Sequence, residues 1–272
     1  MKELSLFTGA GGGVLGSKLL GWTTIGYVEY EKYCQKILKQ RIADGILDAA
    51  PIFGDIRKFI SEGYAEAYKD MVDVISAGFP CQPFSVAGKG LGEDDPRNMW
   101  PATIECIRII RPRYCLLENV PGLLIHDYIK RIFGDLAESG YDVRWTCLSA
   151  AACGAPHLRN RLWIVATLAD AETLADPSLR RCGEQEEGQN QLQGRAKTER
   201  PGAALADADG NREKRNQSQN RQGSGSKQSG WWRFEPDVGR VAHGVAARMD
   251  RLKALGNGQV PQVVKTAWEL LK

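Results

Sequence analysis

Several features typical of membrane, metal-binding or secreted proteins are scarce in this sequence of 272 residues. No apolar run approaches the ~18 residues of a membrane-spanning helix, and Lys2, Glu3 and a glycine run interrupt anything like the apolar core of a signal peptide. Only three histidines are present, and none of the seven cysteines is spaced as Cys-x-x-Cys. This argues against a zinc site and a disulfide framework. We therefore expect a cytoplasmic protein without a metal or a membrane contact.

A large excess of one charge is also missing. The net charge is +3, with 43% hydrophobic and 25% charged residues, which is ordinary globular composition. It excludes collagen-like, coiled-coil and wholly disordered chains. A charge of +3 does not require a polyanionic partner, but it permits one where the basic residues gather locally.

Short apolar runs alternate with amphipathic stretches through the first two-thirds of the chain. We expect strands at 4–7, 24–29, 72–77, 114–118, 143–148 and 162–166, and helices at 14–20, 32–40, 99–110, 128–137 and 261–271. Such alternation is typical of an α/β fold with a doubly wound, mostly parallel sheet. Ligands of these sheets bind beyond the carboxyl ends of the strands. Residues 256–258, Gly-Asn-Gly, predict a turn before the last helix.

The segment 182–230 has little that could form a core. It contains no aromatic residue, and its only large aliphatic residues are Leu192 and Leu205. Such a stretch buries too little apolar surface to offset the entropy lost on ordering. We therefore expect a domain of residues 1–166 plus 250–272, interrupted by a small, partly irregular region at 167–249.

A glycine-rich turn, residues 9–13, follows the first expected strand and precedes a helix. Glycines let a ligand approach the backbone, and a helix N-terminus favours negative charge. Glu29 ends the next strand, where a carboxylate accepts hydrogen bonds from ribose hydroxyls. These features predict a nucleoside site; the alternative is a tight turn without a ligand. Asp55 follows a third apolar run and is either an adenine-binding acid or a helix N-cap.

The most informative cysteine is Cys81. A buried strand ends at Gly78, and the cysteine follows in a loop stiffened by Pro80 and Pro83. A thiolate is an excellent nucleophile, and a rigid loop holds it in place. The alternative is a buried cysteine that packs as a small hydrophobic residue. That alternative suits Cys34, Cys106 and Cys115, which lie in expected helices or strands.

Two further groups of polar residues lie near strand ends. Glu118 ends the strand 114–118 and therefore emerges on the same rim as Cys81. A carboxylate would raise the pKa of a nearby thiol, so Glu118 suits work on a substrate ring better than activation of Cys81. Arg159 and Arg161 alternate onto one face, where two guanidinium groups suit phosphate or a carbonyl oxygen. The alternatives are a strand-end acid and a solvated edge.

Taken together, these blocks resemble those of the DNA cytosine-5 methyltransferases. The similar blocks are Phe-Thr-Gly-Ala-Gly-Gly (7–12), Glu-Tyr (29–30), Gly-Asp-Ile (54–56), Gly-Phe-Pro-Cys-Gln (78–82), Glu-Asn-Val (118–120), Arg-x-Arg (159–161) and Leu-Gly-Asn (255–257) with Val-Pro (260–261). They occur in the family's order and cover residues 1–166 and about 250–272.

The resemblance implies a role for each matching residue. The residues implied to bind S-adenosylmethionine are Phe7, Gly9, Gly11, Glu29, Tyr30, Asp55, Ile56, Gly78, Trp100 and Asn257. Cys81, next to Pro80, would attack C6 of a flipped cytosine. The base must flip out of the duplex first, because C6 otherwise lies inside the base stack. Glu118 would hold or protonate N3, and Arg159 and Arg161 would support the base carbonyl and the loop.

The resemblance also implies partners. The substrate would be double-stranded DNA, with a restriction endonuclease acting separately, and the enzyme would be a monomer in the cytoplasm of a bacterial or phage-infected cell. Residues 167–249 would recognise the target sequence. Within them, we expect 182–230 to be mobile in the free protein and to order on DNA; the alternative is a nonspecific tether.

Two features depart from the family pattern: His157 replaces a common glutamine, and Gly258-Gln259 precedes Val260. The remaining alternatives are an inert DNA-binding homologue, an RNA cytosine-5 methyltransferase, and a nicotinamide dehydrogenase suggested only by glycines 11, 13 and 16.

Overall fold

The computed structural model describes residues 1–80, 98–169 and 248–272. They belong to one compact unit, Met1–Leu174 with Val238–Lys272, whereas a second unit, Ala175–Asp237, lies outside the described residues. Cys81 and the segment 182–230 also lie outside them. The domain boundaries and the behaviour of 182–230 therefore stay predictions.

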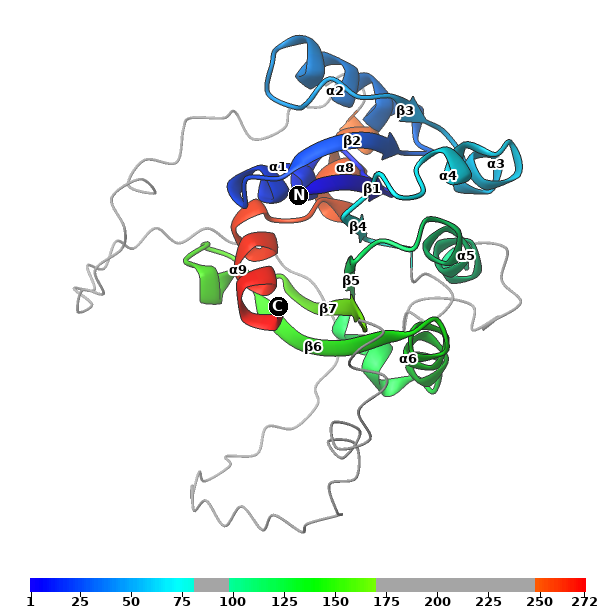
Figure 1. Ribbon diagram of the computed structural model, residues 1–272. Helices are drawn as coiled ribbons and strands as arrows, with labels where there is room; N and C mark the ends of the chain where they lie inside the picture. The colour runs from blue at the N-terminus through cyan, green and yellow to red at the C-terminus, as the bar shows by residue number, and fades with distance from the viewer. Residues whose placement is uncertain (81–97, 170–247) are drawn as a thin grey trace, which may run out of the picture. The chain divides into compact units, whose positions relative to one another are not determined.

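Seven strands form one sheet in the order β3-β2-β1-β4-β5-β7-β6 (Figure 1). The strands are β1 (Lys2–Leu6), β2 (Thr23–Val28), β3 (Ile52–Phe53), β4 (Val74–Ala77), β5 (Tyr114–Asn119), β6 (Tyr141–Ser149) and β7 (Asn160–Leu168). All pairs from β3 to β5 are parallel, and β7 is antiparallel to both β5 and β6. The predicted doubly wound, mostly parallel sheet is confirmed. Strand β3 was not among the expected strands, because two residues are too few to show an alternation of apolar and polar side chains.

Helices cover both faces of this sheet (Figure 1). They are α1 (Gly12–Leu19), α2 (Lys32–Ala43), α3 (Ile56–Ser61), α4 (Tyr64–Ala67), α5 (Trp100–Ile110), α6 (Tyr128–Glu138), α8 (Arg248–Asn257) and α9 (Pro261–Leu271), with 3-10 turns η3 (Pro121–Ile125) and η4 (Ala151–Cys153). Helices α3 to α6 lie on one face, and α1, α2 and α9 on the other. The adjacent Leu116 and Leu117 of β5 enter different core clusters, because successive strand residues point to opposite faces.

One prediction about the C-terminal part was wrong. Residues 256–258 were expected to form a turn, but Gly256 and Asn257 are the last residues of α8. The turn begins only at Gly258, whose N–H donates to the Leu255 carbonyl at 3.3 Å. The large apolar residues of helix α8, Met249, Leu252 and Leu255, are all exposed, so they do not mark a face that packs on the core. An amphipathic pattern therefore could not reveal it.

The C-terminal helix packs on the first helix through a glycine contact. A Cβ at Gly16 would lie 2.5 Å from Val264 Cβ and 2.7 Å from the Pro261 carbonyl oxygen, so α1 and α9 approach as only glycine allows. Trp268 of α9 makes edge-on contacts with Trp22 and Tyr114, at ring centroid distances of 4.8 and 5.3 Å. Each such pair contributes about 0.5–1.5 kcal/mol beyond its buried area. This packing brings the segment between α8 and α9 to the glycine-rich turn.

Glu3 connects four elements beneath that turn. Its side chain is fully buried and accepts hydrogen bonds from Ser17 Oγ at 2.7 Å, Thr24 Oγ1 at 2.7 Å and Ser76 Oγ at 2.6 Å. These hydroxyls belong to α1, β2 and β4. Burial raises the pKa of Glu3, and the three hydrogen bonds only partly oppose that rise.

Candidate active site

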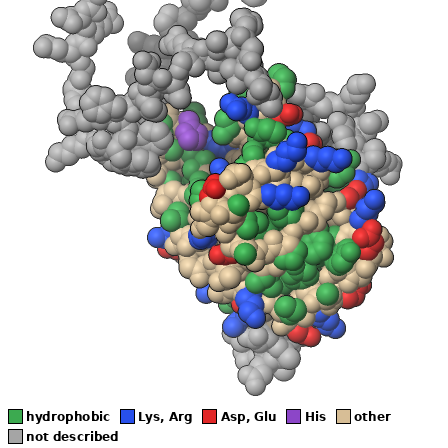
Figure 2. All heavy atoms as spheres, turned by 90° about the horizontal axis from the view of Figure 1, so that it is seen from above, with side chains coloured by type: hydrophobic (Ala, Val, Ile, Leu, Met, Phe, Trp, Pro, Cys, Tyr) green, Lys and Arg blue, Asp and Glu red, His purple; other side chains and the backbone are tan. Residues whose placement is uncertain are grey.

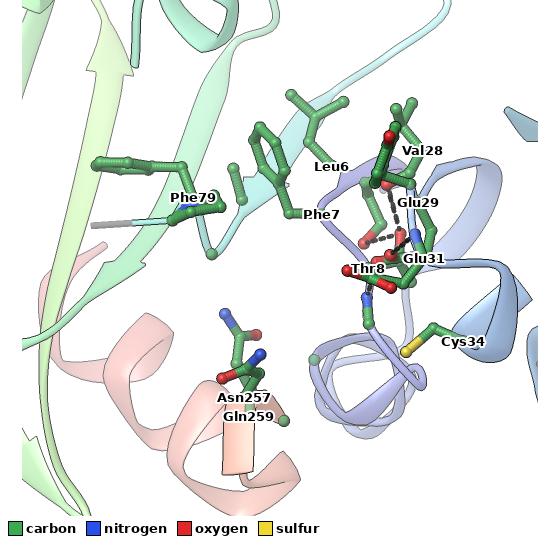
Figure 3. A pocket seen from close by; sticks show the side chains of 18 of the residues that line it. Leu6, Phe7, Thr8, Val28, Glu29, Glu31, Cys34, Phe79, Asn257 and Gln259 are labelled. Atoms are coloured by element: carbon green, nitrogen blue, oxygen red, sulfur yellow. Dashed lines mark hydrogen bonds between the residues drawn. The ribbon is translucent and has the colours of Figure 1, made fainter. Parts of the chain in front are cut away.

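A cavity of about 580 Å³ opens at the carboxyl ends of β1, β2, β4 and β5. The segment that joins α8 to α9 closes its other side, as the positions of Asn257 and Gln259 in Figure 3 show. The predicted site residues that line it are Phe7, Gly9, Glu29, Tyr30, Asp55, Ile56, Gly78, Pro80, Glu118, Arg159, Arg161 and Asn257. Residues that are up to 250 positions apart in the sequence thus meet in one place.

Two described residues of the prediction, Gly11 and Trp100, are not in that lining. Cys81 lies outside the described residues. Gly11 is the N-cap of α1, and a Cβ there would lie 3.1 Å from the side chains of Leu38 and Leu47, so this glycine serves the packing of α1 against α2. Trp100 is fully buried, and its indole N–H donates to Asp135 at 2.7 Å.

The turn after β1 has the backbone geometry that its glycines predict. Gly9 and Gly11 have φ angles of 59° and 88°, in the left-handed region, and Phe7 also has a positive φ of 52°. Thr8 Oγ1 donates to the Ser5 carbonyl at 2.9 Å and so holds the turn against β1. The backbone N–H of Gly9 is thereby aimed at the end of β2.

Glu29 receives that N–H. Its Oε2 accepts from Gly9 N at 2.5 Å and its Oε1 from Glu31 N at 2.7 Å, the bonds drawn in Figure 3. The side chain is buried, and burial raises its pKa against the opposing effect of these two hydrogen bonds. A carboxylate oxygen has two lone pairs, so each oxygen can still accept a further hydrogen bond from a ligand.

Two other residues, Asp55 and Cys34, line the cavity and also belong to helix ends or helices that form its wall. Asp55 is the N-cap of α3, accepting from Arg57 N at 2.9 Å, and it also borders the cavity. Both interpretations of Asp55 therefore agree with its position. Cys34 lines the cavity from α2 but is buried, and burial raises its pKa to about 11. Cys34, Cys106 and Cys115 are all buried thiols, as predicted.

The segment that leads to Cys81 is held from two sides. Phe79 packs on the Trp100 ring at a centroid distance of 5.2 Å, so Trp100 supports the cavity wall from behind. Asn119 Nδ2 donates to the Phe79 carbonyl at 3.2 Å, which ties the end of β5 to this segment. Asn119 stands inside the Glu-Asn-Val block, but the block alone does not predict this contact. Pro80, next in the chain, lines the cavity.

Glu118 at the end of β5 has a partner on each carboxylate oxygen. Arg161 Nε lies 3.0 Å from Oε1, and Gln259 Nε2 lies 3.5 Å from Oε2. Burial raises the pKa of Glu118, while Arg161, Gln259 and Arg159 act in the opposite direction. The antiparallel pairing of β5 with β7 places Arg161 there. A solvated edge is therefore the wrong interpretation for Arg161.

Arg159 has a different task from Arg161. Its guanidinium donates to the carbonyls of Gly256, at 2.9 Å, and Gly258. Lys253 of α8 pairs with Glu31 at 2.5 Å on the other side of the cavity. Together these contacts hold α8 and the following turn over the site. Lys253 and Gln259 are site residues that no motif predicts, apart from the unusual Gly258-Gln259 pair.

Figure 2 looks onto the end of the sheet where α2 and β3 lie. Lys32, Lys36 and Lys39 are exposed on α2. Acidic side chains are interspersed with basic ones in this view, so this face is not uniformly basic.

Among the described residues, no group of three or more His, Cys, Asp or Glu is placed to hold a metal ion. No helix in these residues has the length and apolarity to cross a membrane.

Comparisons with known proteins agree with this geometry. The family model described as C-5 cytosine-specific DNA methylase matches residues 1–259. The Type II methyltransferase M.NgoMIV of Neisseria gonorrhoeae is 36% identical over 168 residues, which cover 60% of this chain and 51% of the relative. M.HaeII of Haemophilus aegyptius is 36% identical over 171 residues, covering 61% and 50%. The chain spans about half the length of these curated relatives.

Solved structures show the same fold. A protein described as a DNA modification methyltransferase encoded within an E. coli prophage matches with a TM-score of 0.50 and 26% identity, covering 62% of this chain and 47% of that one. The Dnmt2 methyltransferase of S. pombe matches with a TM-score of 0.51 over 69% of this chain and 57% of that one. At 19% identity, this second likeness concerns the fold alone.

Proposed function

The chain belongs to the C-5 cytosine-specific DNA methylase family, and from this premise we propose that it transfers a methyl group from S-adenosylmethionine to C5 of cytosine in double-stranded DNA. One observation carries the proposal. The lining of one cavity contains both the Gly9–Glu29 contact and the Glu118–Arg161 pair, and Pro80, the residue before Cys81, belongs to the same lining. A cofactor lobe and a base lobe would thus adjoin.

The residues of the first lobe suit S-adenosylmethionine. Glu29 offers carboxylate oxygens to ribose hydroxyls, Asp55 offers a carboxylate to an adenine amino group, and Phe7 and Ile56 offer apolar surface to the adenine ring. When bound, the cofactor supplies an electrophilic methyl group on a sulfonium. The chain's contribution there is to bind and orient it.

The second lobe suits a pyrimidine ring. In the proposed reaction the Cys81 thiolate adds to C6 of a flipped cytosine, and the Glu118 carboxyl gives its proton to N3. The electron pair of the former C5–C6 double bond makes C5 the nucleophile that takes the methyl group. The C5 proton then leaves to a base, the Cys81 thiolate is expelled, and the N3 proton returns to Glu118. Burial raises the pKa of Glu118 and so favours the protonated form that the proposed reaction requires.

Methyl transfer is the direct test. Purified protein with methyl-labelled S-adenosylmethionine and duplex DNA is expected to yield labelled 5-methylcytosine on nucleoside analysis, and Cys81→Ser to abolish it. Cys147→Ser is the matched control, since Cys147 is an exposed cysteine of β6 that does not line the cavity. Label in adenine, in the exocyclic amine of cytosine, or only in transfer RNA would overturn the proposal.

The biological setting follows as part of the same proposal. The names of the relatives, Type II methyltransferases, support methyl transfer as the activity. We propose in addition that the protein acts as a cytoplasmic monomer beside a separate restriction endonuclease. Bisulfite sequencing of DNA from cells that express the protein would identify the modified base and its sequence context. Unmodified cytosine throughout would contradict it.

A further inference from the structure

Gln259, between α8 and α9, enters a slot that glycines leave open. A Cβ at Gly78 would lie 2.8 Å from Gln259 Nε2, and a Cβ at Gly13 would collide with Gln259 Oε1. The Gln259 carbonyl would collide in the same way with a Cβ at Gly12. Figure 3 shows its side chain directed into the cavity beside Asn257. The slot thus guides the amide between the glycine-rich turn and the end of β4.

The amide reaches the carboxylate oxygen that Arg161 leaves free. Gln259 Nε2 lies 3.5 Å from Glu118 Oε2, whereas Arg161 Nε lies 3.0 Å from Oε1. A Cβ at Gly78 would lie 3.0 Å from the same Oε2, so glycine is also needed for the approach of Glu118. One oxygen therefore faces a permanent cation and the other a neutral amide.

A neutral amide has a chemical advantage at this position. It donates from Nε2 to an ionised carboxylate, and after rotation it accepts at Oε1 from a protonated one. The charged side chains that act on Glu118 from the described residues are Arg161 on β7 and Arg159 just before it. Both favour only the ionised form. Gln259 alone in this set can bond to Glu118 in either protonation state.

We propose that Gln259 is a positioning residue for Glu118, which holds Oε2 and thereby fixes the orientation of the carboxyl group toward the cytosine ring. The inference rests on the proposed function, because it assigns a task to the residue next to the predicted proton donor. Gln259 acts through Glu118 and is distinct from the residues that would bind the cofactor.

Gln259→Leu tests this role, since leucine keeps most of the side-chain volume but has no hydrogen-bonding group. We expect kcat to fall about tenfold, as for loss of a hydrogen bond to a charged group, with KM for cofactor and DNA changed less than twofold. The limb of the pH–kcat profile set by Glu118 should move to higher pH, because a hydrogen bond that lowers its pKa is lost. Gln262→Leu, on an exposed glutamine of α9, is the matched control.

Gln259→Glu provides a second variant of nearly identical shape. Two carboxylates at this distance disfavour joint ionisation, so the limb of the pH–kcat profile set by Glu118 should move to still higher pH than in Gln259→Leu. A carbon-13 NMR titration of Glu118 in wild type and Gln259→Leu gives a readout that needs no turnover. A thermal melt checks that each variant is folded.

The outcomes separate the two claims. An unchanged kcat, pH profile and Glu118 titration in folded Gln259→Leu would overturn the positioning role while leaving the proposed function intact. A rise in KM for the cofactor at constant kcat would overturn it in favour of a cofactor contact. Wild-type protein that forms no 5-methylcytosine would overturn the proposed function itself.

Discussion

The two lobes of the cavity each centre on a glutamate at a strand end, Glu29 buried and Glu118 partly buried, and the two carboxylates are held in different ways. Glu29 is bonded by two backbone N–H groups, from Gly9 and Glu31. Glu118 is bonded by two side chains, those of Arg161 and Gln259. Backbone donors are fixed in position and charge, whereas side chains can rotate. In the proposed function this difference suits a fixed acceptor in the first lobe and an acid that changes its protonation state in the second.

Substitution of Glu118 should have the largest effect. Glu118→Gln keeps the shape of the side chain but cannot give a proton to N3, so kcat should fall roughly 10²–10⁴-fold. Single-turnover methyl transfer under saturating cofactor and DNA measures this. Cofactor affinity should stay near that of wild type. A loss of cofactor affinity at unchanged kcat would show that the two lobes do not divide their tasks in this way.

Substitution of Glu29 should produce the opposite pattern. Glu29→Gln replaces one acceptor oxygen with an NH2 group, so only one of the Gly9 and Glu31 N–H groups keeps an acceptor, and the turn region loses a bond to a charged group worth about 1.5–3 kcal/mol. We expect cofactor affinity to fall at least tenfold, as measured by calorimetry. The transfer rate at saturating cofactor should change much less. Equal losses in both quantities would contradict the comparison.

A methyl group at Gly78 should disturb the second lobe. The Cβ of Gly78→Ala would lie within 3.0 Å of both Gln259 Nε2 and Glu118 Oε2. These side chains must move apart, so kcat should fall several-fold. Gly122→Ala is the control, because nothing lies within 4 Å of a Cβ there. Equal behaviour of the two variants would refute the close packing.

A third glutamate, Glu3, extends the comparison to stability and should show the smallest effect. It has three hydroxyl donors and no cationic partner among its hydrogen bonds. Its pKa is raised above the ordinary 4.5, so its contribution to stability is complete below that value and declines as pH rises through the folded-state pKa. Glu3→Gln should flatten this dependence in urea unfolding at several pH values. Glu105→Gln, on an exposed residue of α5, should leave it unchanged.

Much of the first lobe could be predicted from the sequence because its contacts are local or follow from strand ends. The glycine-rich turn, Glu29 and Asp55 each stand directly after a strand, and parallel strands bring their carboxyl ends to one edge. For Trp100 and Gly11 the role implied by the resemblance stays a prediction, since neither lines the cavity. Both lie next to the lobe, but one supports Phe79 and the other contacts α2.

The second lobe could be predicted only in part. Glu118 and Arg161 were identified as candidates, but their pairing depends on β7 running antiparallel to β5. Gln259 is 141 positions from Glu118, and helix α8, which leads to it, carries exposed apolar residues that no amphipathic pattern explains. Contacts across such a separation have no signature in a short window of sequence.

The sequence by itself determined the alternation of strands and helices, and with it the sheet edge at which the acidic residues emerge. Backbone hydrogen bonding and side-chain periodicity act over a few residues, so they can be read from the chain directly. Only the tertiary structure decided which groups neutralise Glu118 and why Gly12, Gly16 and Gly78 must lack side chains. Those answers depend on where α9 docks and how β5 pairs with β7, which are properties of the packed core as a whole.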